Sequence, residues 1–160
     1  MKKDSEKTNV MRLLDQKKIP YEAFYYDGEG LSGEDVAKVL GEDEKLVYKT
    51  LVTRGRDRSF YVFVIPVAQE LDLKKAASSV GEKSIEMIKQ KELLPLTGYI
   101  HGGCSPLGMK KFFPTALDDS AEALERIYIS AGRVGAQVCL SPRDLEKVIK
   151  LKYAALTKQS

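Results

Sequence analysis

Apolar residues along the chain follow two spacings, one typical of amphipathic helices and the other typical of strands. Apolar positions three or four residues apart, bounded by capping residues, prolines or glycines, predict helices. These helices cover residues 8–18, 32–40, 72–81, 84–91 and 142–151. Short runs rich in β-branched and aromatic residues predict strands. These strands cover residues 21–26, 46–53, 60–66, 114–118, 126–130 and 135–141.

Two of the predicted helices have distinct boundary signals. Ser32, followed three residues later by Asp35, resembles a capping box with a shorter acid, and Gly41 is a typical residue just past a helix end. The helix over 84–91 is expected to stop before Pro95, because proline lacks the amide hydrogen that a helix interior needs.

The order of these elements indicates the fold class. The strands over 46–53 and 60–66 are joined by a short polar loop and predict an antiparallel hairpin. Residues 98–108 are glycine-rich and predict an irregular segment. No repeat, low-complexity stretch or linker is evident. We therefore expect a single α+β domain over residues 1–160, with a mixed or antiparallel sheet flanked by short helices.

Composition narrows the class of protein. With 43% hydrophobic and 31% charged residues, the chain has the make-up of a globular protein, which excludes a disordered, collagen-like or coiled-coil chain. The 26 Lys and Arg against 23 Asp and Glu give a formal net charge of +3, which permits an RNA partner without requiring one. No apolar run is long enough for a signal peptide or a membrane span, so we expect a cytoplasmic protein with no membrane partner.

The sequence has few residues of the types that usually perform chemistry. Its one histidine is His101, and its two cysteines, Cys104 and Cys139, are too far apart for a Cys-x-x-Cys redox pair. One histidine excludes a multi-histidine metal site, so we expect no metal. Unpaired cysteines fit a reducing compartment. A thiol nucleophile built from Cys104 and His101 stays open, although such residues more often line a pocket or pack.

Lys49 is anomalous within its predicted strand. Side chains of a strand alternate between two faces, and both faces of residues 46–53 are largely apolar. An unpaired ammonium group is costly to desolvate there, which favours a functional role. The alternative is an edge-strand lysine that reaches water or prevents edge-to-edge pairing, and the spacing by itself favours that alternative.

The glycine-rich segment 98–108 is the second candidate. Gly98 and Gly103 have the spacing of a phosphate-binding loop, but Cys104 stands where that motif needs lysine, so nucleoside triphosphate hydrolysis is not expected. The Gly102–Gly103 pair lets the backbone approach a ligand closely, and free amides there would suit a carbonyl oxygen or an oxyanion. A tight structural turn is the alternative explanation of these glycines.

Three other features carry weaker signals. Tyr26 ends the first predicted strand, where its phenol could project into a cleft, although tyrosines at strand ends usually only pack. Ser105 is expected to cap a short helix that begins at Pro106. The pair Lys110–Lys111 could contact phosphates, but paired lysines usually form a solvated face.

Several stretches together resemble a known family. Residues 98–108, with Lys110–Lys111 after them, resemble the signature loop of the YbaK/EbsC family. Other matching stretches are Tyr48–Leu51, Leu71–Ala77, Glu86–Met87 and Ile127–Ser130. Their order and spacing agree from about residue 8 to residue 150. The pattern is more similar to the freestanding Cys-tRNA(Pro) deacylases of the family than to its alanyl-specific members or to the editing domain inserted in bacterial prolyl-tRNA synthetases.

The resemblance implies a fold and an activity. The fold would be a mixed, mostly antiparallel, curved and barrel-like sheet flanked by short helices. The activity would be trans-editing, in which a freestanding enzyme deacylates mischarged Cys-tRNA(Pro), with Cys-tRNA(Cys) as a second substrate. The implied partners are tRNA and a transiently bound prolyl-tRNA synthetase, and no cofactor is implied. The substrate's own thiol would attack its ester carbonyl and form a cyclic thiolactone, which would explain the shortage of catalytic side chains.

Carried over residue by residue, the resemblance implies catalytic roles for Lys49, Gly102 and Tyr26. The implied substrate-binding positions are Gly103, Cys104, Ser105, Pro106, Ser130 and Gln137. The amides of Gly102 and Gly103 would bind the carbonyl oxygen. Lys49 would contact the phosphate of the terminal adenosine or the developing charge. Tyr26 and Ser130 would hold the aminoacyl group.

Two positions depart from the pattern of the family. Ala131 stands where relatives often have glycine, and Gln137 occupies a position that is often acidic or serine. Both flank the expected amino-acid pocket. The resemblance therefore supports ester hydrolysis more strongly than it supports cysteine as the amino acid that is removed. Two alternatives therefore stay open, namely a deacylase for another small amino acid such as alanine, and a non-catalytic module that binds an amino acid or an aminoacyl end.

Overall fold

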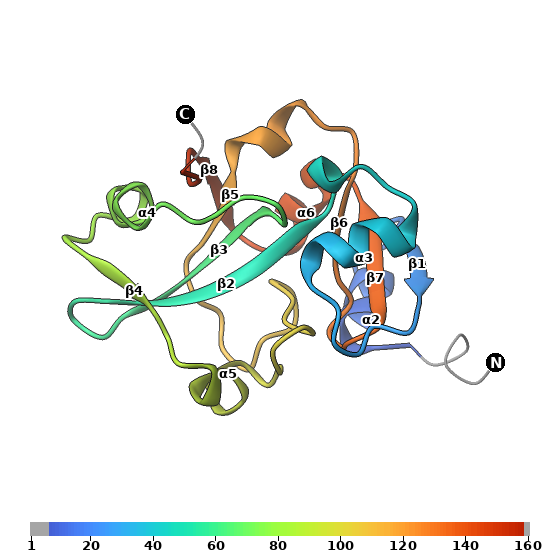
Figure 1. Cartoon of the computed structure of the whole chain (residues 1–160), viewed down its shortest axis with the longest axis horizontal. Helices are drawn as coiled ribbons and strands as arrows, with labels where there is room; N and C mark the ends of the chain where they lie inside the picture. The colour runs from blue at the N-terminus through green and yellow to red at the C-terminus, as the bar shows by residue number, and fades with distance from the viewer. Residues whose placement is uncertain (1–6, 159–160) are drawn as a thin grey trace.

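The computed structural model describes residues 7–158 and has an α+β architecture (Figure 1). Its helices are α2 (Asn9–Gln16), α3 (Gly33–Leu40), α4 (Leu73–Val80), α5 (Gln90–Thr97) and α6 (Pro142–Val148), with 3-10 turns η1 (Glu44–Leu46) and η2 (Asp119–Ala123). Its strands are β1 (Glu22–Tyr25), β2 (Tyr48–Gly55), β3 (Phe60–Pro66), β4 (Ile85–Met87), β5 (Thr115–Asp118), β6 (Ile127–Ser130), β7 (Ala136–Leu140) and β8 (Leu151–Ala154). Residues 1–6, which contributed to the expectation that the chain has no signal peptide, lie outside the described residues.

The strands form two sheets. A five-stranded sheet has the order β4-β2-β3-β5-β8, and a three-stranded sheet has the order β1-β7-β6. A parallel bridge between Val47 and Tyr128 links the two sheets at the start of β2. Pairing is mostly antiparallel, with β3–β5 and β5–β8 as parallel pairs. The predicted α+β class with mixed, mostly antiparallel pairing is confirmed, and the described strands form two open sheets rather than a closed barrel.

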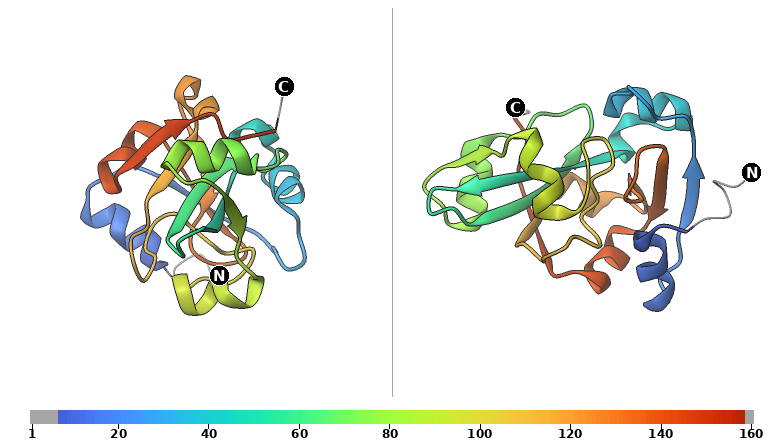
Figure 2. Two further views of the ribbon diagram at one scale, coloured as in Figure 1. Left: turned by 90° about the vertical axis from the view of Figure 1, so that its left-hand side faces the viewer. Right: turned by 90° about the horizontal axis from the view of Figure 1, so that it is seen from below.

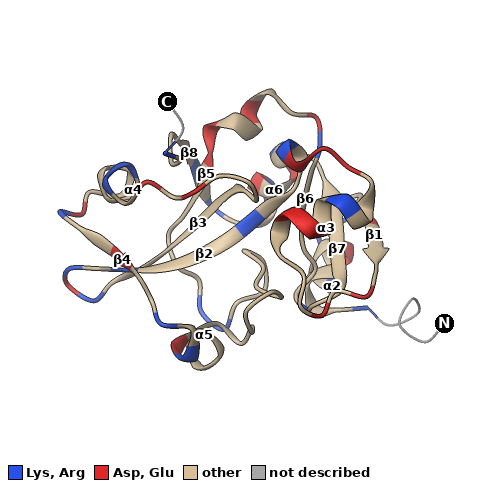
Figure 3. Cartoon of the chain, viewed as in Figure 1, with Lys and Arg blue, Asp and Glu red and all other residues tan. Residues whose placement is uncertain are grey.

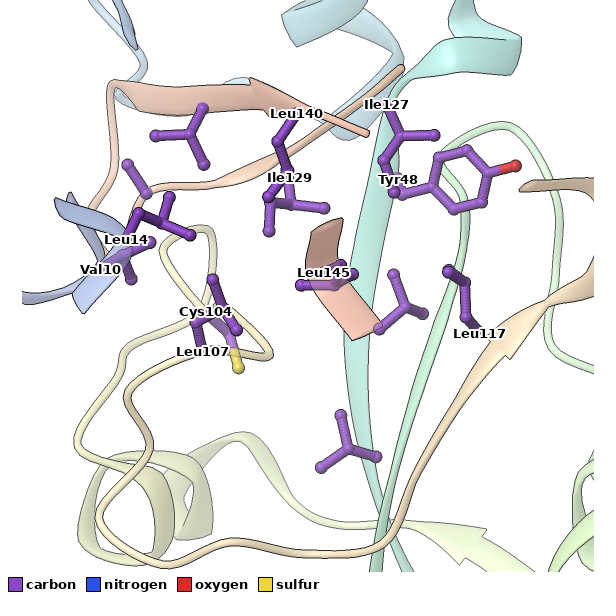
Figure 4. Close-up of a cluster of buried hydrophobic side chains, with 14 of the residues drawn as sticks. Val10, Leu14, Tyr48, Cys104, Leu107, Leu117, Ile127, Ile129, Leu140 and Leu145 are labelled. Carbon is purple, nitrogen blue, oxygen red and sulfur yellow. The ribbon is translucent and has the colours of Figure 1, made fainter. Parts of the chain in front are cut away.

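The hydrophobic core fills the space between the two ends of the molecule. Figure 2 (right) shows the β2–β3 hairpin with α4 and β4 at one end, and β1 with α2 and α3 at the other. Val10 and Leu14 of α2, Ile129 of β6 and Leu145 of α6 are buried in the main cluster (Figure 4). Leu107 joins the same cluster, so the core fixes one end of the glycine-rich loop.

Several local predictions are confirmed. The hairpin forms as expected, with Lys49 opposite Ile65 in its register. The capping box at the start of α3 is present, because the Asp35 amide donates to Ser32 Oγ at 3.1 Å and the Ser32 amide donates to Asp35 Oδ2 at 3.2 Å. Gly41 ends α3 in the left-handed conformation, as glycine does most readily.

The helix expected over 84–91 is wrong. Its first part is the short strand β4, which pairs with Thr53–Gly55 of β2, and α5 begins only at Gln90. Pro95 lies inside α5, and the helix ends instead at Gly98, whose amide donates to the Leu94 carbonyl at 2.8 Å. Edge pairing to an existing hairpin outweighed the local helical spacing, which is a tertiary effect that a sequence pattern does not contain.

Candidate active site

A pocket of about 200 Å³ opens near the junction of the two sheets. Its walls come from the start of α3, from β2, β6 and β7, and from the glycine-rich loop. Five of the predicted site residues line this pocket, namely Lys49, Gly102, Cys104, Ser130 and Gln137. They come from β2, from the glycine-rich loop and from the paired strands β6 and β7, three parts of the chain that are distant in sequence, so the tertiary fold brings them together.

Lys49 holds its amine inside this pocket. The side chain is half-buried, and its Nζ donates to the Val67 carbonyl oxygen at 3.2 Å. Burial lowers the pKa of the Lys49 amine, while the charges of Glu34 and Glu70 act in the opposite direction. One N–H is used by Val67, and the ammonium group has two further donors for a bound anion or carbonyl.

The two loop glycines have different structural tasks. The Gly103 amide donates to the Ile100 carbonyl at 2.9 Å, and Gly102 has a φ of +89°, which is the geometry of a type II turn with glycine at its third position. A Cβ on Gly103 would lie 2.9 Å from the Cα of Arg133 and the amide nitrogen of Val134. The Gly103 amide is therefore already engaged, whereas the exposed Gly102 amide has no acceptor among the described residues.

Cys104 and His101 do not form a catalytic pair in this structure. Cys104 is buried in the main core cluster, and burial raises the pKa of its thiol to about 12. His101 is exposed at the tip of the turn, and no hydrogen bond joins it to Cys104 within residues 7–158. Since the thiolate is the nucleophilic form of cysteine, a thiol held neutral by its surroundings is a poor nucleophile.

Ser105 and Pro106 support the loop instead of lining the pocket. Both are buried, and Ser105 Oγ accepts a hydrogen bond from the Leu107 amide at 3.2 Å. The helix expected to begin at Pro106 is absent from this part of the described chain, so that prediction is wrong. A serine–proline pair closes a tight turn as readily as it caps a helix, and here the turn formed.

Gln137 and Ser130 form the polar side of the pocket, and Tyr26 supports it from behind. Gln137 Nε2 donates to the Tyr26 hydroxyl at 3.2 Å, and burial raises the pKa of this phenol. Tyr26 does not line the pocket itself but is one hydrogen bond away from it. Ser130 Oγ accepts from the Gly132 amide at 3.1 Å. Gln137 is only 7% exposed, and its Oε1 has no partner among the described residues, which leaves a buried acceptor at the pocket wall.

Sequence reasoning missed the wall formed by α3 and by the residue after β3. Gly33, the first residue of α3, lies so close to Val67 that an added Cβ would be 2.8 Å from the Val67 Cβ. Val67 in turn supplies the carbonyl that holds Lys49. The available signal was a glycine in the first helical turn, a position where glycine lowers helix stability and so needs another reason.

The described residues offer no centre for a metal ion. Within 7–158, no group of three or more His, Cys, Asp or Glu side chains is placed to hold one. In the same range, no helix combines the length and the apolar character that crossing a membrane requires.

Comparison with known proteins identifies the family. Residues 29–148 match the family described as the aminoacyl-tRNA editing domain. The chain belongs to this family. The matched range contains every predicted site residue except Tyr26, and it agrees with the resemblance read from the glycine-rich loop and the strand of Lys49.

Individual relatives extend this result. The chain is 45% identical over 158 residues to EbsC of Enterococcus faecalis, covering 98% of this chain and 96% of that protein, whose name describes it provisionally as a Cys-tRNA(Pro)/Cys-tRNA(Cys) deacylase. It is 32% identical over 78 residues to the proline–tRNA ligase of Thermosipho africanus, of which the match covers 14%. A crystal structure described, again provisionally, as a trans-editing enzyme for prolyl-tRNA synthetase has the same fold, with a TM-score of 0.83 and 21% identity over 96% of this chain and 100% of that one.

Proposed function

We propose that this editing-domain protein deacylates tRNA mischarged with cysteine, with Cys-tRNA(Pro) as a substrate and Cys-tRNA(Cys) as a second one. The observation that carries the proposal is the composition of the pocket. It gathers a half-buried lysine, an exposed glycine amide and a buried amide oxygen without a partner in the described chain, while its cysteine is held as a neutral thiol. Such a site suits positioning and charge stabilisation more than attack by a protein nucleophile.

The size of the pocket supports a small aminoacyl group. Its volume of about 200 Å³ is below the usual range for drug-sized ligands. A synthetase pocket shaped for proline discriminates poorly against another small residue, so mischarged tRNA of this kind has to be cleared by hydrolysis. The name of the 45% identical relative supports cysteine as that residue.

The proposed reaction uses the thiol of the substrate. The cysteinyl sulfur attacks the carbonyl carbon of its own ester, so that a carbon–sulfur bond forms while the bond to the ribose oxygen breaks. The thiol proton ends on the ribose hydroxyl of the released tRNA, and the cyclic thiolactone is then hydrolysed by water to free cysteine. These two steps need no oxidant and no cofactor.

The residues of the pocket have distinct tasks in this scheme. The exposed Gly102 amide donates to the carbonyl oxygen as negative charge develops on it. Lys49 contributes positive charge, either at that oxygen or at the phosphate of the terminal adenosine. Gln137 Oε1 accepts from the α-ammonium group, and Tyr26 fixes the orientation of Gln137 through their 3.2 Å hydrogen bond. Ser130 lies beside them at the pocket wall.

A transient complex with prolyl-tRNA synthetase would supply the choice of tRNA. The similarity of this chain to a short part of a proline–tRNA ligase supports a shared substrate, with editing in trans by a single domain over residues 1–160. In this scheme the pocket recognises the aminoacyl group, and none of its lining residues requires a particular tRNA sequence.

A deacylation panel tests the proposal. Purified protein is mixed with tRNA(Pro) charged with cysteine, serine, alanine or proline, and the release of each amino acid is measured. We expect release of cysteine alone, with Lys49→Ala slowing it by about 100-fold or more, as the loss of a group that stabilises charge in the transition state does. Lys38→Ala, which removes an exposed lysine of α3 outside the pocket lining, serves as the matched control and should leave the rate unchanged.

Each other outcome points to a different function. Serine released at a rate comparable to cysteine would contradict the thiol mechanism, because a hydroxyl is a far poorer nucleophile. Alanine released instead would make the protein a deacylase for another small amino acid. Binding of charged tRNA without any release would make it a non-catalytic module.

A further inference from the structure

The outer side of α5 forms an exposed surface next to the pocket, which we call the α5 face. It consists of the exposed residues Lys91 and Leu94 of α5 and of the exposed residues Ile100, Lys110, Lys111 and Phe112 from the chain after the helix. Leu93 and Leu96, on the inner side of the same helix, pack against the main core cluster. One side of α5 is therefore apolar and packed, and the other is exposed.

Short contacts hold the parts of the α5 face together. The Lys110 amide donates to the Thr97 carbonyl at 3.0 Å, and Lys110 Nζ donates to the Pro95 carbonyl at 3.3 Å, so the segment that starts at Lys110 lies against the end of α5. At the other end of the helix, Arg54 of β2 makes an ion pair with Glu92 at 2.8 Å. The surface is therefore a fixed part of the fold.

The segment that contains the α5 face carries an excess of positive charge. Residues 89–113 contain four lysines and one glutamate, an excess of three positive charges that equals the net charge of the whole chain. That glutamate, Glu92, is already paired with Arg54 and accepts from the Lys89 amide at 2.9 Å, while no ion pair joins Lys91, Lys110 or Lys111 to a carboxylate within the described residues. Figure 3 shows Lys and Arg segments along α5 and beside it.

The same surface exposes large apolar side chains. Leu94 is 50% exposed, Ile100 is 53% exposed and Phe112 is 57% exposed, which is unusual for side chains that could otherwise be buried. Lysines interleaved with exposed aromatic and aliphatic side chains are typical of surfaces that bind single-stranded nucleic acid, where the lysines contact phosphates and the apolar side chains contact bases. The α5 face lies next to the pocket, since Leu93 and His101, the chain neighbours of Leu94 and Ile100, line that pocket.

We infer that the α5 face binds the acceptor end of the tRNA whose ester enters the pocket. Lys91, Lys110 and Lys111 contact phosphates of the acceptor stem, and Phe112 and Ile100 contact the unpaired bases at its 3′ end. This inference rests on the proposed function, because it names the surface along which that substrate reaches the pocket.

Binding of uncharged tRNA tests the inference without requiring catalysis. The dissociation constant of fluorescently labelled tRNA(Pro) is measured by anisotropy between about 50 and 200 mM KCl. We expect Lys91→Gln/Lys111→Gln to raise it by about tenfold and to lower the slope of log affinity against log salt by about 1.4–1.8, the value for two lost phosphate contacts. The matched control is Lys74→Gln/Lys83→Gln, which removes two exposed lysines in α4 and just after it, across the β2–β3 hairpin from α5 in Figure 1, and should change neither quantity.

Phe112→Ser separates the base contacts from the phosphate contacts. It should weaken binding of intact tRNA without changing the salt slope, and it should have no effect on tRNA that lacks the unpaired 3′ end. Wild-type affinity and slope in the double lysine variant would overturn the inference. A defect that appears only when a synthetase is present would overturn it too, since the surface would then bind protein. Wild-type protein that binds tRNA but releases no amino acid would refute the proposed function while the binding result still decides the role of this surface.

Discussion

The Lys49 side chain is positively charged and half-buried, and its burial affects how the stability of the protein depends on pH. Burial lowers the pKa of its amine, so the ammonium form is lost at a lower pH than for a lysine in water. Between the lowered pKa of the folded protein and the ordinary lysine pKa, unfolding takes up a proton at this position. The contribution of Lys49 to the free energy of unfolding therefore rises with pH in that window.

Activity should depend on pH in the opposite direction. If the charged amine stabilises the transition state, the wild-type deacylation rate, corrected for hydrolysis without enzyme, should fall on the alkaline side below the usual lysine pKa. Lys49→Arg keeps its charge at any such pH, so whatever rate it retains should lack the part of the alkaline fall that loss of the Lys49 charge causes. A carbon-13 NMR titration of the Lys49 Cε gives the pKa directly. An unperturbed lysine pKa, or the same alkaline fall in both proteins, would contradict the assignment.

The residues of the site differ in how far the sequence could predict them. Lys49 was visible as a cation in an apolar strand, and Gly102 as part of a glycine pair, because each breaks a local pattern. The close approach of Gly103 to Arg133 and the unpaired Gln137 oxygen depend on contacts between distant segments, so no local pattern could show them. Cys104 looked available in sequence, and only its burial explains why its thiol stays neutral.

At the scale of elements, capping signals were confirmed at two helices, whereas strand pairing between distant segments was missed. The caps Ser32 of α3 and Ser141 of α6 formed as expected, since each hydroxyl accepts from a backbone amide two or three residues later, but the helix expected after Ser105 did not form. The strand β4 was missed because its partner is β2, about 30 residues earlier. The strand β8 was missed for the same reason, since it pairs with β5.

The contact between α3 and Val67 gives a prediction at this scale. Gly33→Ala places a methyl group 2.8 Å from the Val67 Cβ, so α3 or the end of β3 must shift. Overpacking of this kind costs about 1–3 kcal/mol, partly offset by the better helix propensity of alanine, about 1 kcal/mol. We expect a lower Tm, and a lower deacylation rate as well because the Val67 carbonyl holds Lys49.

A double-mutant cycle checks the physical cause. Val67→Gly removes both side-chain atoms that the new methyl group would meet at 2.8 Å, Cβ and Cγ1, so Gly33→Ala should cost less in that background than in the wild type. The free energy of unfolding of all four proteins is measured by urea denaturation. Additive effects of the two substitutions would show that the close contact is not responsible.

On the scale of the whole molecule, the pocket lies near the place where two sheets meet, and both thiols of the chain are buried in hydrophobic clusters. Cys104 lies in the main cluster, and Cys139 lies in the cluster of α3, β6 and β7. Burial raises the pKa of both thiols. The arrangement leaves the reaction without a reactive protein thiol, which fits a substrate that carries its own.

Alkylation of the native protein distinguishes these two sources of the thiol. Iodoacetamide reacts with thiolates, so treatment near pH 8 should leave the deacylation rate unchanged within about twofold, provided that the reagent is quenched before charged tRNA is added. Cys104→Ala removes only a wall contact of the pocket, so it should slow the reaction far less than Lys49→Ala does, with Cys139→Ala as the matched control for loss of a buried thiol. Labelling of Cys104 in the folded protein, with activity lost in proportion and protected by bound tRNA, would show instead that the enzyme supplies the nucleophile. In that case His101 would be the candidate base, and the substrate-thiol mechanism would have to be abandoned.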